Sequence, residues 1–201
     1  MMANPLDLSG QRFLVTGASS EIGSQTCRLL AKLGASVLLV ARNESNLKAV
    51  REELGEGSHH CVPFDLECVE DIPFWLKSLV QNHGLLNGLV HIAGVQSVNP
   101  LRSTPLEEIE TMIRVNLTSS LILFKAFAGR GFRAQNSSVV FVSSVAGIIG
   151  ESGIAVYSAT KGALNSLARS LAVEFSGSRI RVNAVAPGFI PTETANIAKK
   201  F

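Results

Sequence analysis

The sequence predicts an α/β fold in which helices cover both faces of a parallel β-sheet. Two observations predict it. Short strand-like runs alternate with longer helical patterns along the whole chain. These runs are mostly continuously apolar rather than alternating, as expected for strands that are buried on both faces. Because crossovers between parallel strands are right-handed, the order of elements favours a doubly wound, Rossmann-type sheet in a single domain over residues 1–201.

The individual elements follow in order from local signals. Short β-branched or apolar runs predict strands at residues 12–16, 36–41, 59–63, 88–92, 139–143 and 181–186. Between the first two strands, apolar residues recur at helical spacing from Ile22 to Leu33, and Gly34 ends that helix. Further helices are predicted at residues 44–54, 69–82, 105–128 and 157–175. Pro105 after Thr104 is a standard signal for a helix start.

Composition and charge exclude several classes of protein. The chain has 201 residues, of which 46% are hydrophobic, so it can form a core and is not intrinsically disordered. A net charge of +2 without a long basic run gives no signature of nucleic-acid or anionic-lipid binding. No apolar stretch is long enough to span a bilayer, and the N-terminus lacks a signal-peptide pattern. We therefore expect a cytoplasmic protein with neither a membrane nor a nucleic acid as partner.

Cysteine and histidine usage gives no indication of a metal site. Cys27, Cys61 and Cys68 have no metal-ligand spacing, and we expect small buried thiols in a reducing compartment. The histidines at positions 59, 60 and 83 form no ligand pattern either. No metal is predicted.

A glycine-containing turn joins the first strand to the first helix, in the segment Thr-Gly-Ala-Ser-Ser-Glu-Ile-Gly at residues 16–23. A pyrophosphate needs exposed backbone N–H groups at a tight turn, followed by the positive end of a helix. Gly17 can form this turn, and Gly23 lets the helix approach the sheet. The hydroxyls of Ser19 and Ser20 can add donors. Two glycines alone are weak evidence, but their position after the first strand makes the segment a candidate dinucleotide loop.

The end of the second strand bears on the choice of dinucleotide. Arg42 lies 19 residues after Gly23, near the position where an acidic residue would bind the ribose 2′-hydroxyl of NAD. A guanidinium there can pair with a 2′-phosphate instead. NADP(H) is therefore favoured over NAD(H), with Glu44 and a merely solvated Arg42 as the competing interpretations.

Four polar residues form a candidate catalytic group. Tyr157 and Lys161 lie four residues apart in a helical segment, so their side chains share one face of a helix. Ser144 follows the fifth predicted strand, at the carboxyl edge where open α/β sheets bind ligands. Asn116 lies 28 residues before this serine, within the long helix predicted at residues 105–128. The Tyr-x-x-x-Lys spacing is common by itself, whereas its coincidence with the glycine turn and the serine indicates a catalytic site.

On these residues the sequence resembles the classical short-chain dehydrogenase/reductase family, in particular its 3-oxoacyl-[acyl-carrier-protein] reductases. The matching positions run in the family's order across nearly the entire chain, at residues 16–23, Asp65, Ala93, Gly94, Asn116, Ser144, Tyr157, Lys161, Pro187 and Gly188. The resemblance implies an oxidoreductase that transfers a hydride between a nicotinamide cofactor and a carbonyl or secondary alcohol. It also implies a homodimer or homotetramer built through the two long helices.

The resemblance further implies a role for each residue. Tyr157 exchanges a proton with the substrate oxygen, and Lys161 lowers the pKa of this phenol from about 10 to roughly 7 and binds the nicotinamide ribose. Ser144 orients the substrate oxygen, and Asn116 joins a water relay. Contacts with the cofactor are implied for Gly17, Ser19, Ser20, Glu21, Ile22, Gly23, Arg42, Asp65, Leu66, Ala93, Gly94, Tyr157, Lys161, Pro187, Gly188, Ile190 and Thr192.

The sequence departs from the family pattern in three places. Glu21 stands where the family usually has glycine, at a cost of about 1 kcal/mol or more if the backbone there has a positive φ. The usual Asn-Asn-Ala-Gly reads His-Ile-Ala-Gly at residues 91–94, and Ile92 cannot make the hydrogen bonds of an asparagine. The sequence ends at Phe201, whereas family members continue with a substrate-covering helical segment and a last strand, which we expect to be missing.

The predicted function is therefore NADP(H)-dependent oxidoreduction of a small carbonyl or alcohol substrate. The alternative is a non-catalytic, nucleotide-binding regulatory protein of the same fold, which Glu21 and the early end of the sequence would favour. A sugar epimerase of the extended family is a third option, although its glycine spacing normally differs.

Overall fold

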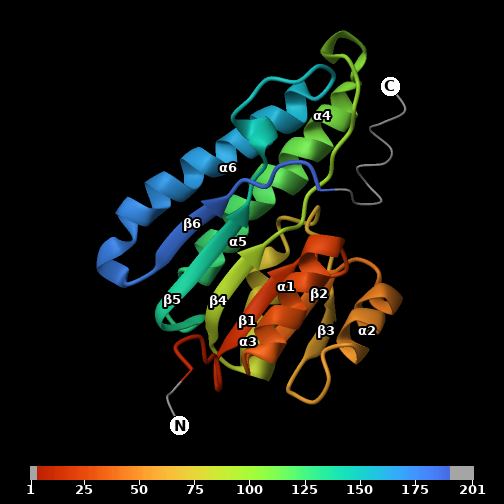
Figure 1. Cartoon of the computed structure of the whole chain (residues 1–201). Helices are drawn as coiled ribbons and strands as arrows, with labels where there is room; N and C mark the ends of the chain where they lie inside the picture. The colour runs from red at the N-terminus through yellow and green to blue at the C-terminus, as the bar shows by residue number, and fades with distance from the viewer. Residues whose placement is uncertain (1–3, 191–201) are drawn as a thin grey trace.

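Six parallel strands form one sheet in the computed structural model, which describes residues 4–190 (Figure 1). The strand order is β3-β2-β1-β4-β5-β6, the doubly wound order that the sequence predicts. After the edge strand β3, the chain crosses back to the middle of the sheet, where β4 pairs with β1. The carboxyl ends of β1 and β4 therefore lie side by side and frame a ligand-binding edge. The strands are β1 (Arg12–Thr16), β2 (Ser36–Ala41), β3 (His60–Pro63), β4 (Leu86–His91), β5 (Arg133–Val142) and β6 (Arg181–Val185).

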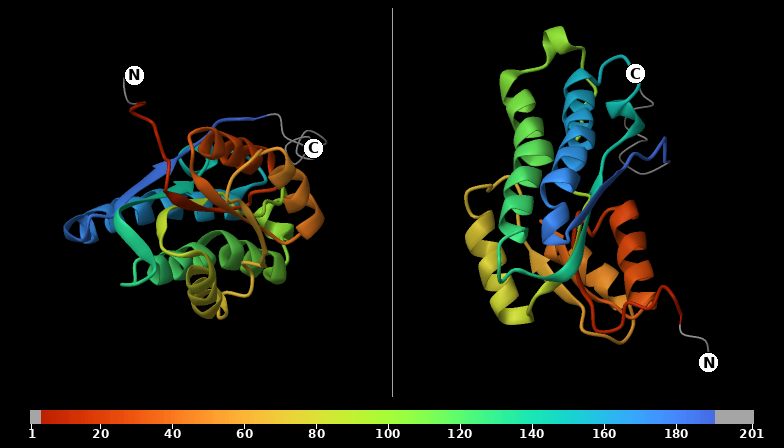
Figure 2. Two further views of the ribbon diagram at one scale, coloured as in Figure 1. Left: turned by 90° about the horizontal axis from the view of Figure 1, so that it is seen from below. Right: turned by 90° about the vertical axis from the view of Figure 1, so that its left-hand side faces the viewer.

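Helices cover both faces of this sheet, as Figure 2 shows. One face packs against α1 and α2, and the other packs against α3, α5 and α6. The helices are α1 (Glu21–Lys32), α2 (Glu44–Glu52), α3 (Ile72–His83), α4 (Leu106–Ile113), α5 (Ser119–Phe127) and α6 (Ala155–Glu174). No helix among the described residues is long and apolar enough to cross a membrane.

Two hydrophobic clusters hold the layers together. Alternate residues of the same strand belong to different clusters, since Leu14 of β1 faces the α3, α5 and α6 side while Val15 faces α1 and α2. Both side chains are fully buried. This two-sided burial explains why the strands are continuously apolar in the sequence. Cys27 of α1 is buried in the smaller cluster as expected, whereas Cys61 is half-buried and Cys68 is exposed, so the expectation of three buried thiols is wrong for these two.

The fifth strand begins earlier than the sequence predicts. β5 starts at Arg133 rather than at Val139, because its first residues are polar and carry no strand pattern. The pairing register shifts within this part: Leu86 pairs with Arg133, and Gly88 pairs with Ser138, so residues 134–137 face a single residue of β4. The other predicted bounds lie within three residues of the observed ones.

The long helix predicted at residues 105–128 is not continuous α-helix. A π-turn, η2 (Arg114–Thr118), separates α4 from α5. The hydroxyls of Ser119 and Ser120 donate to the carbonyls of Val115 and Asn116 within this turn, at 2.5 and 2.8 Å. Single π-turns inside helices frequently occur at functional sites. Here the turn contains Asn116, one of the candidate catalytic residues.

Candidate functional site

The loop between β1 and α1 has the geometry of a phosphate-binding turn. Gly17 has a φ of +67°, and a Cβ atom there would lie 2.8 Å from the backbone nitrogen of Ala93. A Cβ atom on Gly23 would lie 2.0 Å from the carbonyl oxygen of Gly17. Both positions therefore require glycine, the first for its turn and the second for the close approach of α1. Ser20 caps α1 by accepting a hydrogen bond from Gly23 N at 3.1 Å.

Glu21 fits this loop without backbone strain. It is the first residue of α1, and within residues 4–190 only Asn136 and Arg179 among non-glycine residues have a positive φ. The energetic cost considered for a positive φ at Glu21 therefore does not arise. The side chain is exposed at the positive end of the helix, where a carboxylate is favourable. This removes one of the two reasons for preferring a non-catalytic protein.

A buried hydrogen-bond network ties the end of β1 to the end of β4. The Thr16 hydroxyl lies 2.8 Å from Nδ1 of His91, and it accepts hydrogen bonds from the backbone nitrogens of Ile92 and Ala93 at 3.2 and 3.3 Å. Since both lone pairs of the hydroxyl are engaged, its proton is donated to His91 Nδ1. Neutral His91 thus carries its own proton on Nε2. Sequence analysis assigned no role to this histidine.

His91 is held in its neutral form. Burial, with a smaller contribution from the positive charge of Lys161, lowers the pKa of the imidazole to about 3. Its Nε2 atom is buried with no hydrogen-bond partner in the described part of the chain. The neighbouring Ile92 packs into the smaller hydrophobic cluster. A side-chain link between β1 and β4 is thus made by His91, the residue before Ile92.

Tyr157 and Lys161 meet above the end of β5, as their spacing predicts. The Lys161 ammonium lies 5.7 Å from the centre of the Tyr157 ring and donates a hydrogen bond to Val142 O at 2.8 Å. The Ser143 hydroxyl donates to Lys161 O at 2.7 Å, which fixes α6 against the strand end. Ser144 follows directly and hydrogen-bonds to the Tyr157 phenol. Three of the four candidate catalytic residues are therefore in contact.

Asn116 completes this group from the opposite helix. Its side-chain amide accepts from Val95 N at 2.7 Å and donates to Val95 O and to the Thr160 hydroxyl, at 2.8 and 3.1 Å. A Cβ atom on Gly94 would lie 3.1 Å from the Asn116 amide oxygen and 3.3 Å from Lys161 Nζ. Gly94 therefore leaves the space between these two polar groups open. Asn116 itself is fully buried.

The electrostatics of the pair differ from expectation. Burial raises the pKa of the Tyr157 phenol above its usual value of 10, and the hydrogen bond with Ser144 offsets only part of this effect. Burial also lowers the pKa of Lys161 to about 8. Among the groups of the protein itself, the phenol is thus not acidified toward neutrality, because desolvation outweighs the hydrogen bond with Ser144. At pH 7 both groups are protonated.

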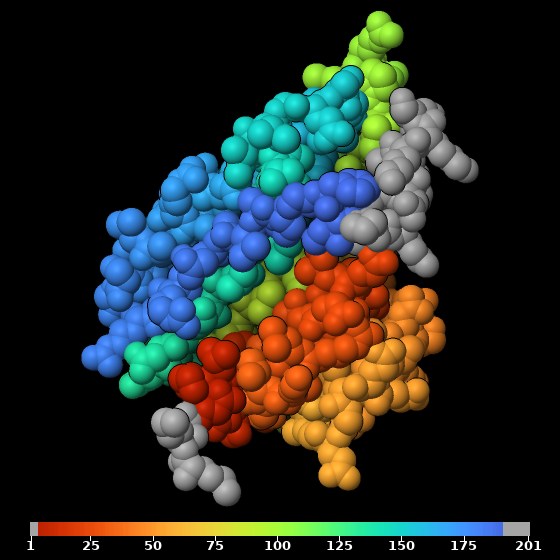
Figure 3. All heavy atoms as spheres, viewed as in Figure 1, coloured from red at the N-terminus to blue at the C-terminus, as the bar shows by residue number. Residues whose placement is uncertain are grey.

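The remaining predicted cofactor residues follow the carboxyl ends of the strands. Arg42 is exposed after β2, and Asp65, which follows β3, accepts a hydrogen bond from Glu67 N at 3.0 Å. Beside it Leu66 is buried. Pro187 O accepts from Val145 N at 3.0 Å, so the segment after β6, blue in Figure 3, is joined to the loop that carries Ser144. The other predicted positions are Ser19, Ile22, Gly188 and the exposed Ile190, while Thr192 lies outside the described residues.

No metal centre is formed by this edge. Within residues 4–190, no group of three or more histidine, cysteine or acidic side chains is placed to hold a metal ion.

The doubly wound strand order and the meeting of Tyr157 with Lys161 at the carboxyl edge define the class of Rossmann-type oxidoreductases. The chain belongs to the short-chain dehydrogenase/reductase family, whose model, described as short chain dehydrogenase, matches residues 11–200. Enzymes of this family act on CH–OH and C=O groups.

Named relatives and solved structures agree with this assignment. The chain is 37% identical to the 3-oxoacyl-[acyl-carrier-protein] reductase of Bos taurus, covering 89% of this chain and 75% of that protein. It is 36% identical to the glucose 1-dehydrogenase of Gluconobacter oxydans, covering 92% and 71%. A short-chain type dehydrogenase/reductase from Mycobacterium marinum superposes with a TM-score of 0.88 at 30% identity, covering 97% of this chain and 79% of that one. A Beutenbergia cavernae structure with NADP bound at low occupancy gives a TM-score of 0.91 at 30% identity, covering 98% and 79%.

Proposed function

We propose that the chain is an NADP(H)-dependent oxidoreductase of a small carbonyl or alcohol substrate, with Tyr157 as the general acid in reduction. The observation that carries this proposal is the contact of Tyr157 with both Lys161 and Ser144 at the carboxyl edge of the sheet. A raised phenol pKa keeps the proton on Tyr157 at neutral pH, which is the form that protonates a carbonyl oxygen.

The residues of the edge fit a dinucleotide. Gly17 and Gly23 leave space that a Cβ atom would fill, and the N-terminus of α1 offers its backbone N–H groups to a pyrophosphate. Because Gly94 has no side chain, the space beside Lys161 and Asn116 is open for the nicotinamide ribose. The bound cofactor would supply the hydride.

Each catalytic side chain has a distinct task in this proposal. The Ser144 hydroxyl orients the substrate oxygen beside the phenol, and Tyr157 donates its proton as negative charge develops on that oxygen. The Lys161 ammonium then stabilises the resulting phenolate. At a separation of about 5–6 Å and an effective dielectric of 20, this attraction is on the order of 3 kcal/mol. Asn116 holds the Val95 segment in place by hydrogen bonds. It also joins a water relay that returns protons from solvent to Tyr157.

The preference for NADP(H) rests on the surroundings of Arg42. The nearest carboxylate in sequence, Glu44, is paired with Lys48 at 2.8 Å across one turn of α2. No ion pair within residues 4–190 involves Arg42, so its guanidinium is available to a 2′-phosphate. The NADP found in the Beutenbergia cavernae structure supports the same preference.

We also propose a cytoplasmic homodimer or homotetramer. Members of this family commonly form such assemblies. Two exposed apolar side chains, Leu121 of α5 and Val173 of α6, offer surface that association would bury. Size-exclusion chromatography with light scattering would measure the assembly.

The Tyr157→Phe variant tests the catalytic proposal. It keeps the ring and removes the proton donor, so turnover of a ketone with NADPH should fall by about 10²–10⁴-fold. The affinity for NADPH, followed by fluorescence titration, should stay within a few-fold of wild type. Turnover comparable to wild type would disprove the assigned general acid. Binding of NADPH by the wild-type protein without turnover of any carbonyl substrate would favour the regulatory alternative.

A further inference from the structure

A polar cavity lies at the end of the sheet opposite the candidate active site. It has a volume of about 470 Å³ and is lined by Arg133, Gln135, Gly177, Ser178 and Arg179. Arg133 begins β5, and Ser144 follows its end. At about 3.3 Å per residue the two sites are separated by roughly 30 Å, so this cavity is not part of the dinucleotide edge.

The cavity is strongly cationic. Two of its five lining residues, Arg133 and Arg179, are arginines, and none of the five is acidic. Neither of these arginines takes part in an ion pair within the described residues 4–190. A neighbouring hollow of about 580 Å³ shares Arg179 and is also lined by Arg181. The like charges of Arg133 and Arg179, with no ion-pair partner in the described residues, create a positive potential that attracts an anion.

Arg133 is the residue least satisfied by the protein itself. Its Nε atom is buried and has no hydrogen-bond partner among the described residues. The guanidinium makes one long hydrogen bond, from Nη1 to Ala134 O at 3.4 Å. An arginine has five N–H donors in a planar fork, so most of the donor capacity of Arg133 is unused. Buried donors without a partner are rare in native proteins and call for an explanation.

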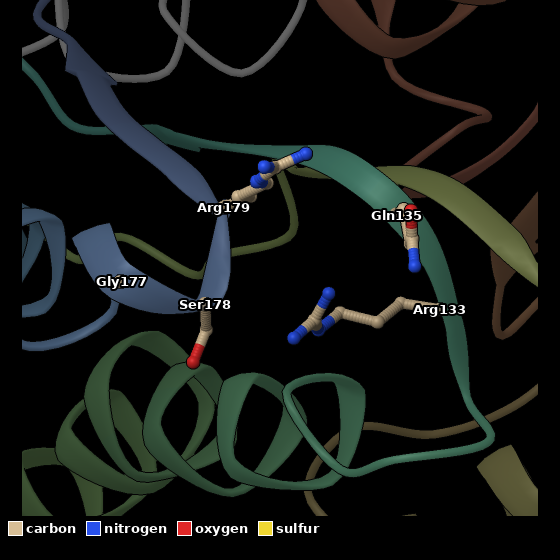
Figure 4. A pocket seen from close by; sticks show the side chains of 5 residues that line it. All are labelled: Arg133, Gln135, Gly177, Ser178 and Arg179. Atoms are coloured by element: carbon tan, nitrogen blue, oxygen red, sulfur yellow. The ribbon is translucent and has the colours of Figure 1, made fainter.

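The backbone is irregular in both segments that line the cavity. The register shift in β5 places residues 134–137 outside regular pairing, and Asn136 has a φ of +58°. Arg179 has a φ of +55° at the end of the turn η4 (Ser176–Ser178). Figure 4 shows the Arg133 guanidinium pointing across the cavity toward Ser178, with the Gln135 amide on the same side and Arg179 reaching back toward β5. Left-handed backbone at non-glycine residues is costly and concentrates at functional sites.

We propose that this cavity binds a small ligand through a phosphate group, held by Arg133 and Arg179 with the Gln135 amide as a third donor. A phosphate dianion neutralises two guanidinium groups and accepts hydrogen bonds on three oxygens. The volume lies within the range of sites for small molecules, which allows more than a bare ion. The low net charge of the whole chain argues for a local anion site rather than a polyanion track.

Isothermal titration calorimetry with glycerol 3-phosphate and with inorganic phosphate, at constant ionic strength, tests the proposal. The variants are Arg133→Gln and Arg179→Gln. The matched control is Arg42→Gln, which removes the same charge at the other end of the molecule, where a cofactor phosphate would bind. We expect saturable binding in the wild type and in Arg42→Gln, weakened at least tenfold in either cavity variant. Circular dichroism checks that each variant is folded, and Arg133→Lys replaces Arg133→Gln if the latter fails to fold.

Three results would overturn the proposal. One is affinity that is lost in Arg42→Gln but retained in the Arg133 and Arg179 variants, since the phosphate would then bind at the dinucleotide edge. Another is no saturable binding of either phosphate to the wild-type protein. The third is binding only to vesicles containing phosphatidic acid or to heparin, because the partner would then be a membrane or a polyanion. None of these results bears on turnover at Tyr157, so this proposal and the proposed function fail independently.

Discussion

The hydroxyl of Thr16 and Nδ1 of His91 lie 2.8 Å apart and join the ends of two neighbouring strands beneath the candidate dinucleotide loop. Thr16 directly precedes Gly17, whose turn packs against Ala93. The contact therefore sets the distance between the glycine turn and the segment that leads to Gly94. We infer that His91 positions the Gly17 turn and the Ala93 segment of the cofactor site without touching the reacting atoms.

Removing the acceptor on His91 should destabilise the fold. In His91→Leu the Thr16 hydroxyl is left buried without its acceptor, and we expect the free energy of unfolding to fall by about 1–3 kcal/mol. In His91→Asn the side-chain carbonyl can accept from the same hydroxyl, so the loss should be smaller. Urea unfolding at pH 7.5 measures both variants. Equal stability of His91→Leu and the wild type would show that the hydrogen bond contributes nothing.

Acid should destabilise the protein through the same residue. The pKa of His91 is about 3 in the folded protein and near 6.5 in the unfolded chain. The unfolded state therefore binds more protons between these values, and stability is lost as the pH falls below 6.5. Between pH 6.5 and pH 5 the contribution of His91 is about 2 kcal/mol. The difference in unfolding free energy between wild type and His91→Asn should shrink or reverse by this amount, and a difference independent of pH would contradict the assignment.

Lys161 should give a pH dependence of the same sign as His91, but at higher pH. Its pKa is lowered by burial to about 8, so the folded protein releases the proton before the unfolded chain does. Stability attributable to Lys161 therefore rises as the pH increases from 8 toward 10.5, by about 3 kcal/mol in total. Lys161→Met should lack this rise and should also lose turnover. Parallel stability curves for the two proteins between pH 8 and pH 10 would show that Lys161 is not desolvated.

Much of the fold could be predicted from the sequence because it follows from short-range patterns. The strands around Leu14 and Val139 are buried on both faces and therefore read as apolar runs. The polar start of β5 carries no such pattern, because residues 134–137 leave regular pairing. The π-turn at Asn116 could not be predicted either, since apolar residues continue at helical spacing through it.

The meeting of Tyr157 with Lys161 could be predicted from the sequence, but the direction of their pKa shifts could not. The spacing of Tyr157 and Lys161 places them on one helix face, and the structure brings them together. The direction of the phenol pKa depends on burial by distant elements, which no local pattern encodes. The part played by His91 was missed because its partner, Thr16, is 75 residues away in the sequence.

Gly23→Ala should damage the dinucleotide site. The added Cβ atom would lie 2.0 Å from the carbonyl oxygen of Gly17, which is backbone and can move only if the turn itself shifts. We expect the affinity for NADPH, measured by fluorescence titration, to fall at least tenfold. Gly150→Ala is the matched control, because nothing lies within 4 Å of a Cβ atom there and its φ is not positive. Unchanged affinity in Gly23→Ala would place the cofactor elsewhere.

Arg42→Asp should reverse the choice of cofactor. The exposed guanidinium has no carboxylate partner among the described residues, and an aspartate at the end of β2 would repel a 2′-phosphate while accepting a hydrogen bond from a 2′-hydroxyl. Loss of one charged phosphate contact is worth about 1.5–3 kcal/mol, which corresponds to roughly 10–100-fold in the ratio of kcat/KM for NADPH over NADH. Arg169→Asp, an equal charge change on the surface of α6, controls for the overall field. A ratio that is the same in Arg42→Asp and Arg169→Asp would show that Arg42 does not read the 2′-phosphate.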